Sequence, residues 1–268
     1  MRNQEIKSSK VRAILAGNKF ELFVYGKKYH YGFSSNAKRS HHPISEEKRR
    51  ENFKKSCGRT RAKIKRLIIE NFGGWEDERG NSYMSKYLTL TFGDNIQNLT
   101  AANEVFSLFM KKLNYSLYGT KKAIIQYLGV IEFQERGAIH YHIIFFNLPF
   151  VNRVYDVLNK LWGEGHMIFK VVKDPDHAAN YLVKYITKDS NDERLYGRKK
   201  YLRSRHLKNF LLLKDQDDIR SLYPMLSPKS RIFKRVFEHE RLGKTTYLIF
   251  KVDENFRSAC LSKKPVAK

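Results

Sequence analysis

The sequence predicts an α+β domain, with helices packed on a mixed sheet, inside a chain of 268 residues. Along residues 87–188 the predicted elements follow the order β-α-β-β-α-β-α, which is typical of this class. The hydrophobic content of 41% is enough to bury a core and excludes a disordered chain. No apolar run approaches the roughly 20 residues of a membrane helix, so we expect no integral membrane protein.

The central elements follow from local pattern. Alternating, β-branched and aromatic residues predict strands at 87–92, 124–133, 138–146 and 166–172. The second and third of these strands are joined by Gln134-Glu135-Arg136-Gly137, a hairpin signal. Apolar residues at helical spacing predict helices that start at Thr100, span 151–162, and run from Asp176 to about Lys188.

The outer elements are predicted in the same way. Alternation around Gly26-Lys27-Lys28 predicts a hairpin over residues 19–33. Ser45 followed by two glutamates predicts a helix start, and the helix continues to about residue 66. Residues 229–242 are expected to be helical, and residues 245–252 are expected to form a last strand.

The charge of the chain indicates a polyanionic partner. Lys and Arg number 52 against 27 Asp and Glu, so the formal net charge is +25. Nucleic acid is favoured over a membrane surface, because a membrane-binding chain would carry a basic amphipathic helix with a wide apolar face. The plainer alternative is a basic protein whose lysines are merely solvated.

The segment from 48 to 66 holds ten basic residues and one acid. It is either a solvated surface helix or a helix that lies along DNA phosphates, and the density of charge favours the second. Its candidate DNA contacts are Lys48, Arg49, Arg50, Arg59, Arg61, Lys65 and Arg66.

A second basic segment, residues 196–210, interleaves cations with Tyr196, Tyr201 and Phe210. Such a pattern suits stacking of bases on a charged groove, and it equally suits a surface loop that its aromatic residues anchor. The candidate DNA contacts here are Arg198, Arg203 and Arg205, and Arg136 in the hairpin joins them.

His140-Tyr141-His142 lies in an otherwise apolar strand, so both imidazoles project to one side. They form either a metal seat or a pair of half-exposed histidines. Antiparallel pairing would bring Glu132 of the preceding strand near them, and a carboxylate among apolar residues needs a cationic partner. Such a set suits Mn²⁺ or Mg²⁺, with histidine tilting the preference toward Mn²⁺ and Zn²⁺ less natural. Glu135, nearer the turn, is the competing acid.

The helix of residues 178–188 carries Tyr181, Lys184, Tyr185 and Lys188 on one face. Two phenols and two ammonium groups suit a phosphate, although a surface helix with ordinary amphipathic tyrosines would show the same spacing. A phenol needs nearby positive charge to act as a nucleophile.

Three segments in order resemble motifs of the HUH rolling-circle replication initiators. They are residues 87–92, His140-Tyr141-His142, and the Tyr-x-x-Lys-Tyr-x-x-Lys of residues 181–188. The third is most similar to phage and plasmid initiators that carry two tyrosines on the catalytic helix. The resemblance covers about residues 45–210 and also includes the long basic helix.

The resemblance implies a five-stranded antiparallel sheet with the histidines on a central strand. It implies a divalent metal, Mn²⁺ or Mg²⁺, held by His140, His142 and Glu132. It implies nicking and rejoining of single-stranded origin DNA by a tyrosine, through a 5′-phosphotyrosine and a free 3′-hydroxyl primer. Tyr181 is the first choice as nucleophile, and Tyr185 is either a second nucleophile or structural.

On this basis the chain divides into a basic N-terminal region (1–80), a nicking core (81–210) and a C-terminal extension with a basic tail (211–268). No Gly-x-x-x-x-Gly-Lys-Ser/Thr loop occurs, so a host helicase and a DNA polymerase are expected partners. We expect a cytoplasmic protein acting on plasmid or phage DNA in a bacterial host, with Cys57 and Cys260 as free thiols.

Two other functions stay open. A related HUH transposase or relaxase would share the motifs, but relaxases usually carry three metal-binding histidines and small transposases are shorter. A non-catalytic single-stranded nucleic-acid-binding protein would explain the charge and the aromatic residues without any metal or cleavage. A basic structural protein would leave the histidines and the tyrosine face unexplained.

Overall fold

The structure is a computed structural model that describes residues 6–32, 44–149, 154–188 and 192–263. These residues form six α-helices and two five-stranded antiparallel sheets, which confirms the α+β class. The chain divides into two compact units, one of residues 44–208 and one that joins residues 1–43 to residues 209–268. Among the described helices, none has the length and apolar character needed to span a membrane.

The sheet of the unit 44–208 has the histidine strand at its centre. The strand order is β6-β3-β5-β4-β7, and every neighbouring pair is antiparallel. All seven residues of β5 are buried, so this strand is covered on both faces. The strands are β3 (Lys86–Thr91), β4 (Tyr127–Phe133), β5 (Ile139–Phe145), β6 (Met167–Val171) and β7 (Tyr201–Arg203).

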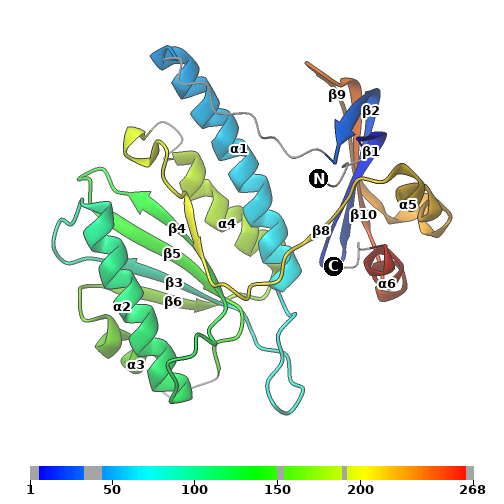
Figure 1. Ribbon diagram of the computed structural model, residues 1–268. Coiled ribbons are helices and arrows are strands. Elements are labelled where there is room, and N and C mark those ends of the chain that lie inside the picture. The colour runs from blue at the N-terminus through cyan, green and yellow to red at the C-terminus, as the bar shows by residue number, and fades with distance from the viewer. Residues whose placement is uncertain (1–5, 33–43, 150–153, 189–191, 264–268) are drawn as a thin grey trace, which may run out of the picture. The chain divides into compact units, whose positions relative to one another are not determined.

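Helices cover both faces of this sheet (Figure 1). On one face lie α2 (Leu99–Tyr118) and α3 (Val154–Trp162), where Tyr141 of β5 stacks on Phe106 with 4.7 Å between ring centroids. On the other face α4 (Pro175–Lys188) packs on β4 and β5, and α1 (Glu46–Asn71) packs on α4. The sheet is therefore the middle layer.

Helix ends follow the expected capping chemistry with one change. The Ser45 hydroxyl accepts a hydrogen bond from the Lys48 backbone N–H and begins α1, as predicted. At α2 the cap is Asn98, whose side chain accepts from Thr100 and Ala101, so the predicted start at Thr100 was two residues late. Gly119 ends α2 in the left-handed conformation, at φ +63°.

The end of β3 is held by a close backbone approach. Gly165 has a φ of +149°, and a Cβ there would lie 2.3 Å from the Gly93 nitrogen and 2.5 Å from the Thr91 oxygen. Backbone hydrogen bonds link Thr91 to His166 and Gly93 to Glu164, each at 2.8 Å. Only glycine fits this position, which fixes the end of the strand that carries Thr91.

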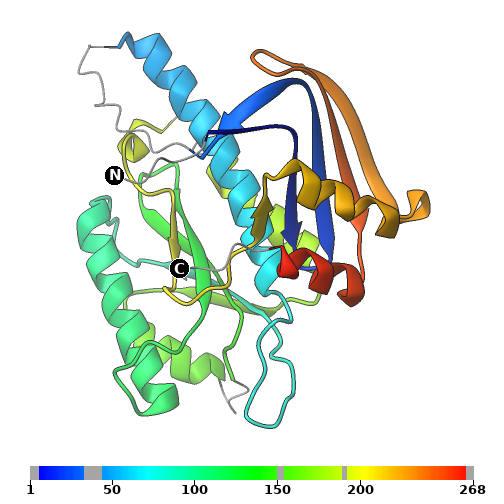
Figure 2. The same cartoon turned by 45° about the vertical axis from the view of Figure 1, so that its right-hand side comes forward.

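The other unit contains the first and last parts of the chain. Its sheet has the order β8-β1-β2-β10-β9, and Figure 2 shows α5 and α6 on one of its faces. Phe20 and Phe256 pack in its core with 4.9 Å between ring centroids. The elements are β1 (Lys7–Ala16), β2 (Lys19–Tyr31), β8 (Leu211–Leu213), α5 (Gln216–Ser221), β9 (Arg231–His239), β10 (Gly243–Lys251) and α6 (Glu254–Ser262).

Two predictions for this unit were wrong. The N-terminal hairpin turns at Gly17-Asn18, not at Gly26, because β2 continues through an irregularity where the β1 register shifts between Ser9 and Val11. Residues 231–239 form β9 rather than a helix, because they pair with β10 along their length. The predicted last strand corresponds to β10.

The compact units cut the chain elsewhere than the three expected segments. Residues 1–80 do not form one region, because β1 and β2 pair with β8 and β10 while α1 packs on α4. Cys57 and Cys260 are buried free thiols, as expected.

Replacing Gly165 with alanine tests the close approach at the end of β3. We expect a loss of about 3 kcal/mol in the free energy of unfolding, because overpacking adds to the strain of a positive φ. Gly163→Ala is the matched control, since its φ is +65° but its nearest neighbour would lie 3.8 Å away. Urea denaturation measures both, and equal losses would contradict the close packing.

Candidate metal centre and tyrosine helix

The pairing of β4 with β5 brings three candidate ligands together. Glu132 lies directly opposite His140, and His142 lies two residues further on the same face of β5. All three side chains are buried, and their ligand atoms lie within 4.8 Å of one another. The structure thus groups Glu132, His140 and His142 as the sequence predicted. Glu135, the competing acid, is exposed beyond the end of β4.

The donor set of this cluster fits a divalent cation. Ligand bonds of about 2.0–2.2 Å place donor atoms roughly 3–4 Å apart on one ion, close to the observed spread. Oε2 of Glu132 lies 2.7 Å from Nε2 of His142. Burying a carboxylate costs free energy unless positive charge compensates it, and a divalent ion supplies that charge. The cluster could bind a metal, and two imidazoles with one carboxylate do not by themselves decide which metal.

A row of hydroxyl groups on β3 faces the two histidines. Thr89 lies opposite His142 and Thr91 opposite His140 in the strand register. The Tyr87 hydroxyl lies 2.7 Å and Thr89 Oγ1 3.2 Å from Nδ1 of His142. Thr91 Oγ1 lies 3.5 Å from Nδ1 of His140. Hydroxyls both donate and accept, so they can hold each Nδ1 and leave Nε2 to act as the ligand atom.

The sequence analysis did not include these hydroxyl residues among the site residues. It used residues 87–92 as a strand and as one motif of the resemblance. The available signal was the period of two, since Tyr87, Thr89 and Thr91 must share one face of a strand.

Helix α4 places two tyrosines over the histidine strand. The Tyr185 ring stacks on the His142 ring, with 3.5 Å between centroids and 9° between planes. Tyr185 is 8% exposed, whereas Tyr181 is half-buried and meets the Tyr87 ring edge-on at 4.8 Å. Lys184 Nζ lies 3.9 Å from the centroid of the Tyr181 ring. The side chain of Lys188, the fourth predicted member of this face, lies outside the described residues.

The surroundings of Tyr185 keep its hydroxyl protonated. Burial raises the pKa of Tyr185, and the neighbouring hydroxyl of Tyr181 and the carboxylate of Glu132 raise this pKa further. The hydroxyl of Tyr87 acts in the opposite direction on the pKa of Tyr185. Burial also raises the pKa of Tyr87 itself. Loss of a proton from this cluster therefore requires added positive charge.

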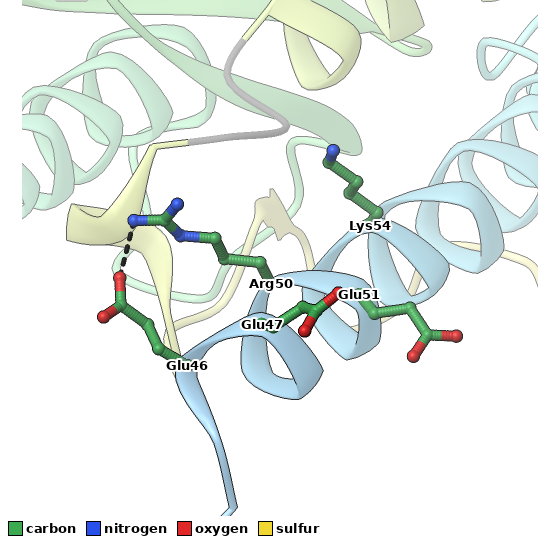
Figure 3. A pocket seen from close by; sticks show the side chains of 5 residues that line it. All are labelled: Glu46, Glu47, Arg50, Glu51 and Lys54. Atoms are coloured by element: carbon green, nitrogen blue, oxygen red, sulfur yellow. Dashed lines mark hydrogen bonds and ion pairs between the residues drawn. The ribbon is translucent and has the colours of Figure 1, made fainter.

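The N-terminal end of α1 is less free for DNA than its charge indicates. Figure 3 shows Arg50 directed at Glu46, and the two form an ion pair at 2.5 Å. Lys48 forms an ion pair with Glu51 at 2.7 Å. Further along α1, Arg59 is exposed, while Arg61, Lys65 and Arg66 are half-buried. The structure brings none of these α1 cations into the metal cluster.

The tyrosines of the second basic segment act as anchors. Tyr196 packs on Phe53 of α1 with 4.4 Å between centroids, and the Arg49 guanidinium lies 5.2 Å from the Tyr196 ring. Lys63 Nζ of α1 lies 5.6 Å from the ring of Tyr201. The anchoring interpretation thus has direct contacts for both tyrosines.

The cations near these tyrosines differ in exposure. Arg198, Arg205 and Arg136 are exposed. Arg203 is half-buried and donates a hydrogen bond to the Leu207 carbonyl at 2.7 Å. Three of the four are therefore accessible to a polyanion.

Comparison with known proteins agrees with this site. Residues 85–190, about two fifths of the chain, match a family described as replication-associated protein, named for its ORF2 members. The matched range contains β3, the Glu132–His140–His142 cluster and α4. No curated protein and no solved structure matches the chain. Over the matched residues the chain is similar to replication-associated proteins, and this similarity supports a replication initiator.

Removing one ligand tests the metal centre. We expect Mn²⁺ to raise the melting temperature of the protein, since a ligand that binds only the native state stabilises it. Glu132→Gln should abolish most of this rise, because it removes the anionic ligand. Glu135→Gln is the matched control and should keep the rise. Differential scanning fluorimetry measures the effect, and equal loss in both variants would contradict the site.

Removing the Tyr87 hydroxyl tests the hydrogen bonds behind the metal. Tyr87→Phe should weaken Mn²⁺ binding about tenfold, because partners of a ligating histidine orient it. Tyr141→Phe is the control, since its hydroxyl bonds to Asn103 on the opposite face of the sheet. Isothermal titration of Mn²⁺ gives both affinities. Unchanged affinity in Tyr87→Phe would show that Thr89 holds Nδ1 of His142 alone.

Proposed function

We propose that this protein is an HUH-type replication initiator that nicks and rejoins single-stranded DNA at a rolling-circle origin. The observation that carries the proposal is the stacking of Tyr185 on His142, next to Tyr181 and above the Glu132–His140–His142 cluster. Nucleophile candidates and candidate metal ligands thus lie side by side. The match of residues 85–190 to replication-associated proteins supports the same function.

The reaction we propose uses Tyr181 as the nucleophile. Its hydroxyl oxygen bonds to the scissile phosphorus, the bond from phosphorus to O3′ breaks, and O3′ takes up a proton while the phenol loses one. The products are a 5′-phosphotyrosine and a free 3′-hydroxyl that primes synthesis. Tyr181 is the more accessible of the two phenols, which favours its contact with a DNA strand. Attack of a 3′-hydroxyl on the phosphotyrosine reverses the step and rejoins the strand.

Positive charge around the phosphate drives this step. A divalent metal, Mn²⁺ or Mg²⁺, would act on the scissile phosphate as a Lewis acid when bound to Glu132, His140 and His142. Lys184 lies close enough to both tyrosine rings to stabilise charge that develops on the phosphate. Lys188, one turn further on, belongs to the same proposed face of α4.

Tyr185 has two possible roles within this proposal. As a second nucleophile it would accept a strand while Tyr181 still holds another. As a structural residue it would only cover His142, and its burial and raised pKa favour this role before DNA binds. The single variants separate the two roles.

The remaining parts of the proposal concern DNA and partners. The basic residues of α1, with Arg136, Arg198, Arg203 and Arg205, would hold the phosphates of the origin strand. We place the chemistry within residues 81–210, which lie almost wholly inside the compact unit 44–208. Host helicase and DNA polymerase would supply unwinding and synthesis on plasmid or phage DNA in a bacterial cell.

Formation of a covalent adduct tests the proposed function. Incubation with labelled single-stranded origin DNA and Mn²⁺ should give a protein–DNA adduct that survives denaturing electrophoresis. Tyr181→Phe should reduce adduct yield by about 10³-fold or more, because it removes the nucleophile, while filter binding of the DNA persists. Tyr185→Phe should keep the first adduct.

Three outcomes would contradict this mechanism. An adduct in the Tyr181→Phe/Tyr185→Phe double variant would exclude both phenols. An adduct confined to Tyr185 would reassign the nucleophile. Metal-independent binding with no cleavage of any origin strand would favour the non-catalytic binding protein.

A further inference from the structure

A basic groove lies at the edge of the same sheet, away from the tyrosine helix. Its volume is about 1060 Å³, and it is formed by the C-terminal half of α2, residues 121–127, and residues 203–206 after β7. Within the described part of the chain, no acidic side chain lines it. Six cations do: Lys111, Lys112, Lys121, Lys122, Arg203 and Arg205.

The floor of this groove is apolar. Met110 and Ile125 are buried there, and the half-buried ring of Tyr127 packs against Phe106 with 5.9 Å between centroids. Tyr115 also lines the groove and is 59% exposed. An exposed phenol beside an apolar floor offers flat surfaces on which a base can stack.

A single buried side chain holds the lysine loop in place. Asn114 Nδ2 donates to the carbonyls of Thr120 and Lys122, at 2.9 and 2.8 Å. Its Oδ1 accepts from the backbone N–H of Ile124 at 2.8 Å. Four like charges placed along one groove repel one another, so a loop that fixes two of them stores electrostatic potential for an anion.

The groove is separate from the metal cluster. Side chains of a strand alternate between its faces, so Tyr127 and Glu132 of β4 point to opposite sides of the sheet. Tyr127 lies on the side of α2, and Glu132 lies on the side of α4. The two residues are also about 17 Å apart along the strand, at 3.3 Å per residue.

We propose that this groove is a second binding site for single-stranded DNA, distinct from the nicking site. Cations on the rim match the phosphates, and the apolar floor with Tyr115 and Tyr127 matches unpaired bases. A DNA duplex or an acidic polypeptide would use the rim charges and leave the floor unfilled. The choice of DNA over RNA rests on the proposed function.

Two sets of variants test the groove. Binding of a fluorescein-labelled single strand is measured by anisotropy in EDTA, so the result does not depend on nicking. Lys121→Ala/Lys122→Ala should weaken binding about tenfold and lower the salt slope by about 1.4, since each lost phosphate contact contributes about 0.7. Tyr115→Ala should weaken binding at least about fivefold without changing that slope, because stacking carries no charge.

Matched controls remove the same groups elsewhere in the same unit. Lys160→Ala/Lys173→Ala also removes two charges, and Tyr155→Ala removes a tyrosine of α3 that is 45% exposed. Both should bind within twofold of the parent protein. Equal losses in test and control variants would overturn the site, as would equal affinity for duplex. Displacement of the strand by polyglutamate as readily as by unlabelled single strand would point instead to an acidic protein partner and also overturn it.

Discussion

The candidate site depends on the register of β4 against β5. Glu132 stands opposite His140 only in this register, and a shift by one residue would turn the carboxylate to the other face of the sheet. The register is strongly specified, because α2 and α3 cover one face and α4 covers the other, so every misplaced polar group would be buried without its partner. The free energy that packs the sheet therefore also holds three potential ligands together. Backbone crowding at Gly165 fixes the end of β3 in the same way, and so fixes the hydroxyl row behind the histidines.

The sequence predicted this site well because its determinants are local. A hairpin of a few residues joins β4 to β5, so the position of Glu132 relative to His140 follows from short-range pairing. The helical period likewise places Tyr181, Lys184 and Tyr185 on one face of α4. Local pattern does not reveal how deeply each tyrosine is buried, because this depends on where α4 lies over the sheet. Tyr185 contacts His142 closely, and Tyr181 stays partly accessible.

The second unit shows the limit of local pattern. Its sheet pairs β1 and β2 with β8 and β10, across nearly the whole length of the chain. Residues 231–239 carry enough charge to suggest a helix, and only pairing with β10 makes them a strand. In β2 the chain passes through Gly26 without turning, because the turn at Gly17-Asn18 already satisfies the hairpin. Long-range pairing of this kind cannot be derived from one sequence by periodicity alone.

The two faces of the central sheet offer different chemistry to the same polymer. The α4 face holds a buried carboxylate, two imidazoles and two phenols, a set suited to breaking and forming a phosphodiester bond. The α2 face ends in a groove with an apolar floor and cations on the rim, and the described residues that line this groove include no carboxylate to hold a metal beside a phosphate. A strand bound there would be retained without being cut. An enzyme that must release one DNA end and keep the other benefits from such a division, because retention by many weak phosphate contacts can be reversed one contact at a time, whereas the covalent bond to tyrosine is reversed only by chemistry.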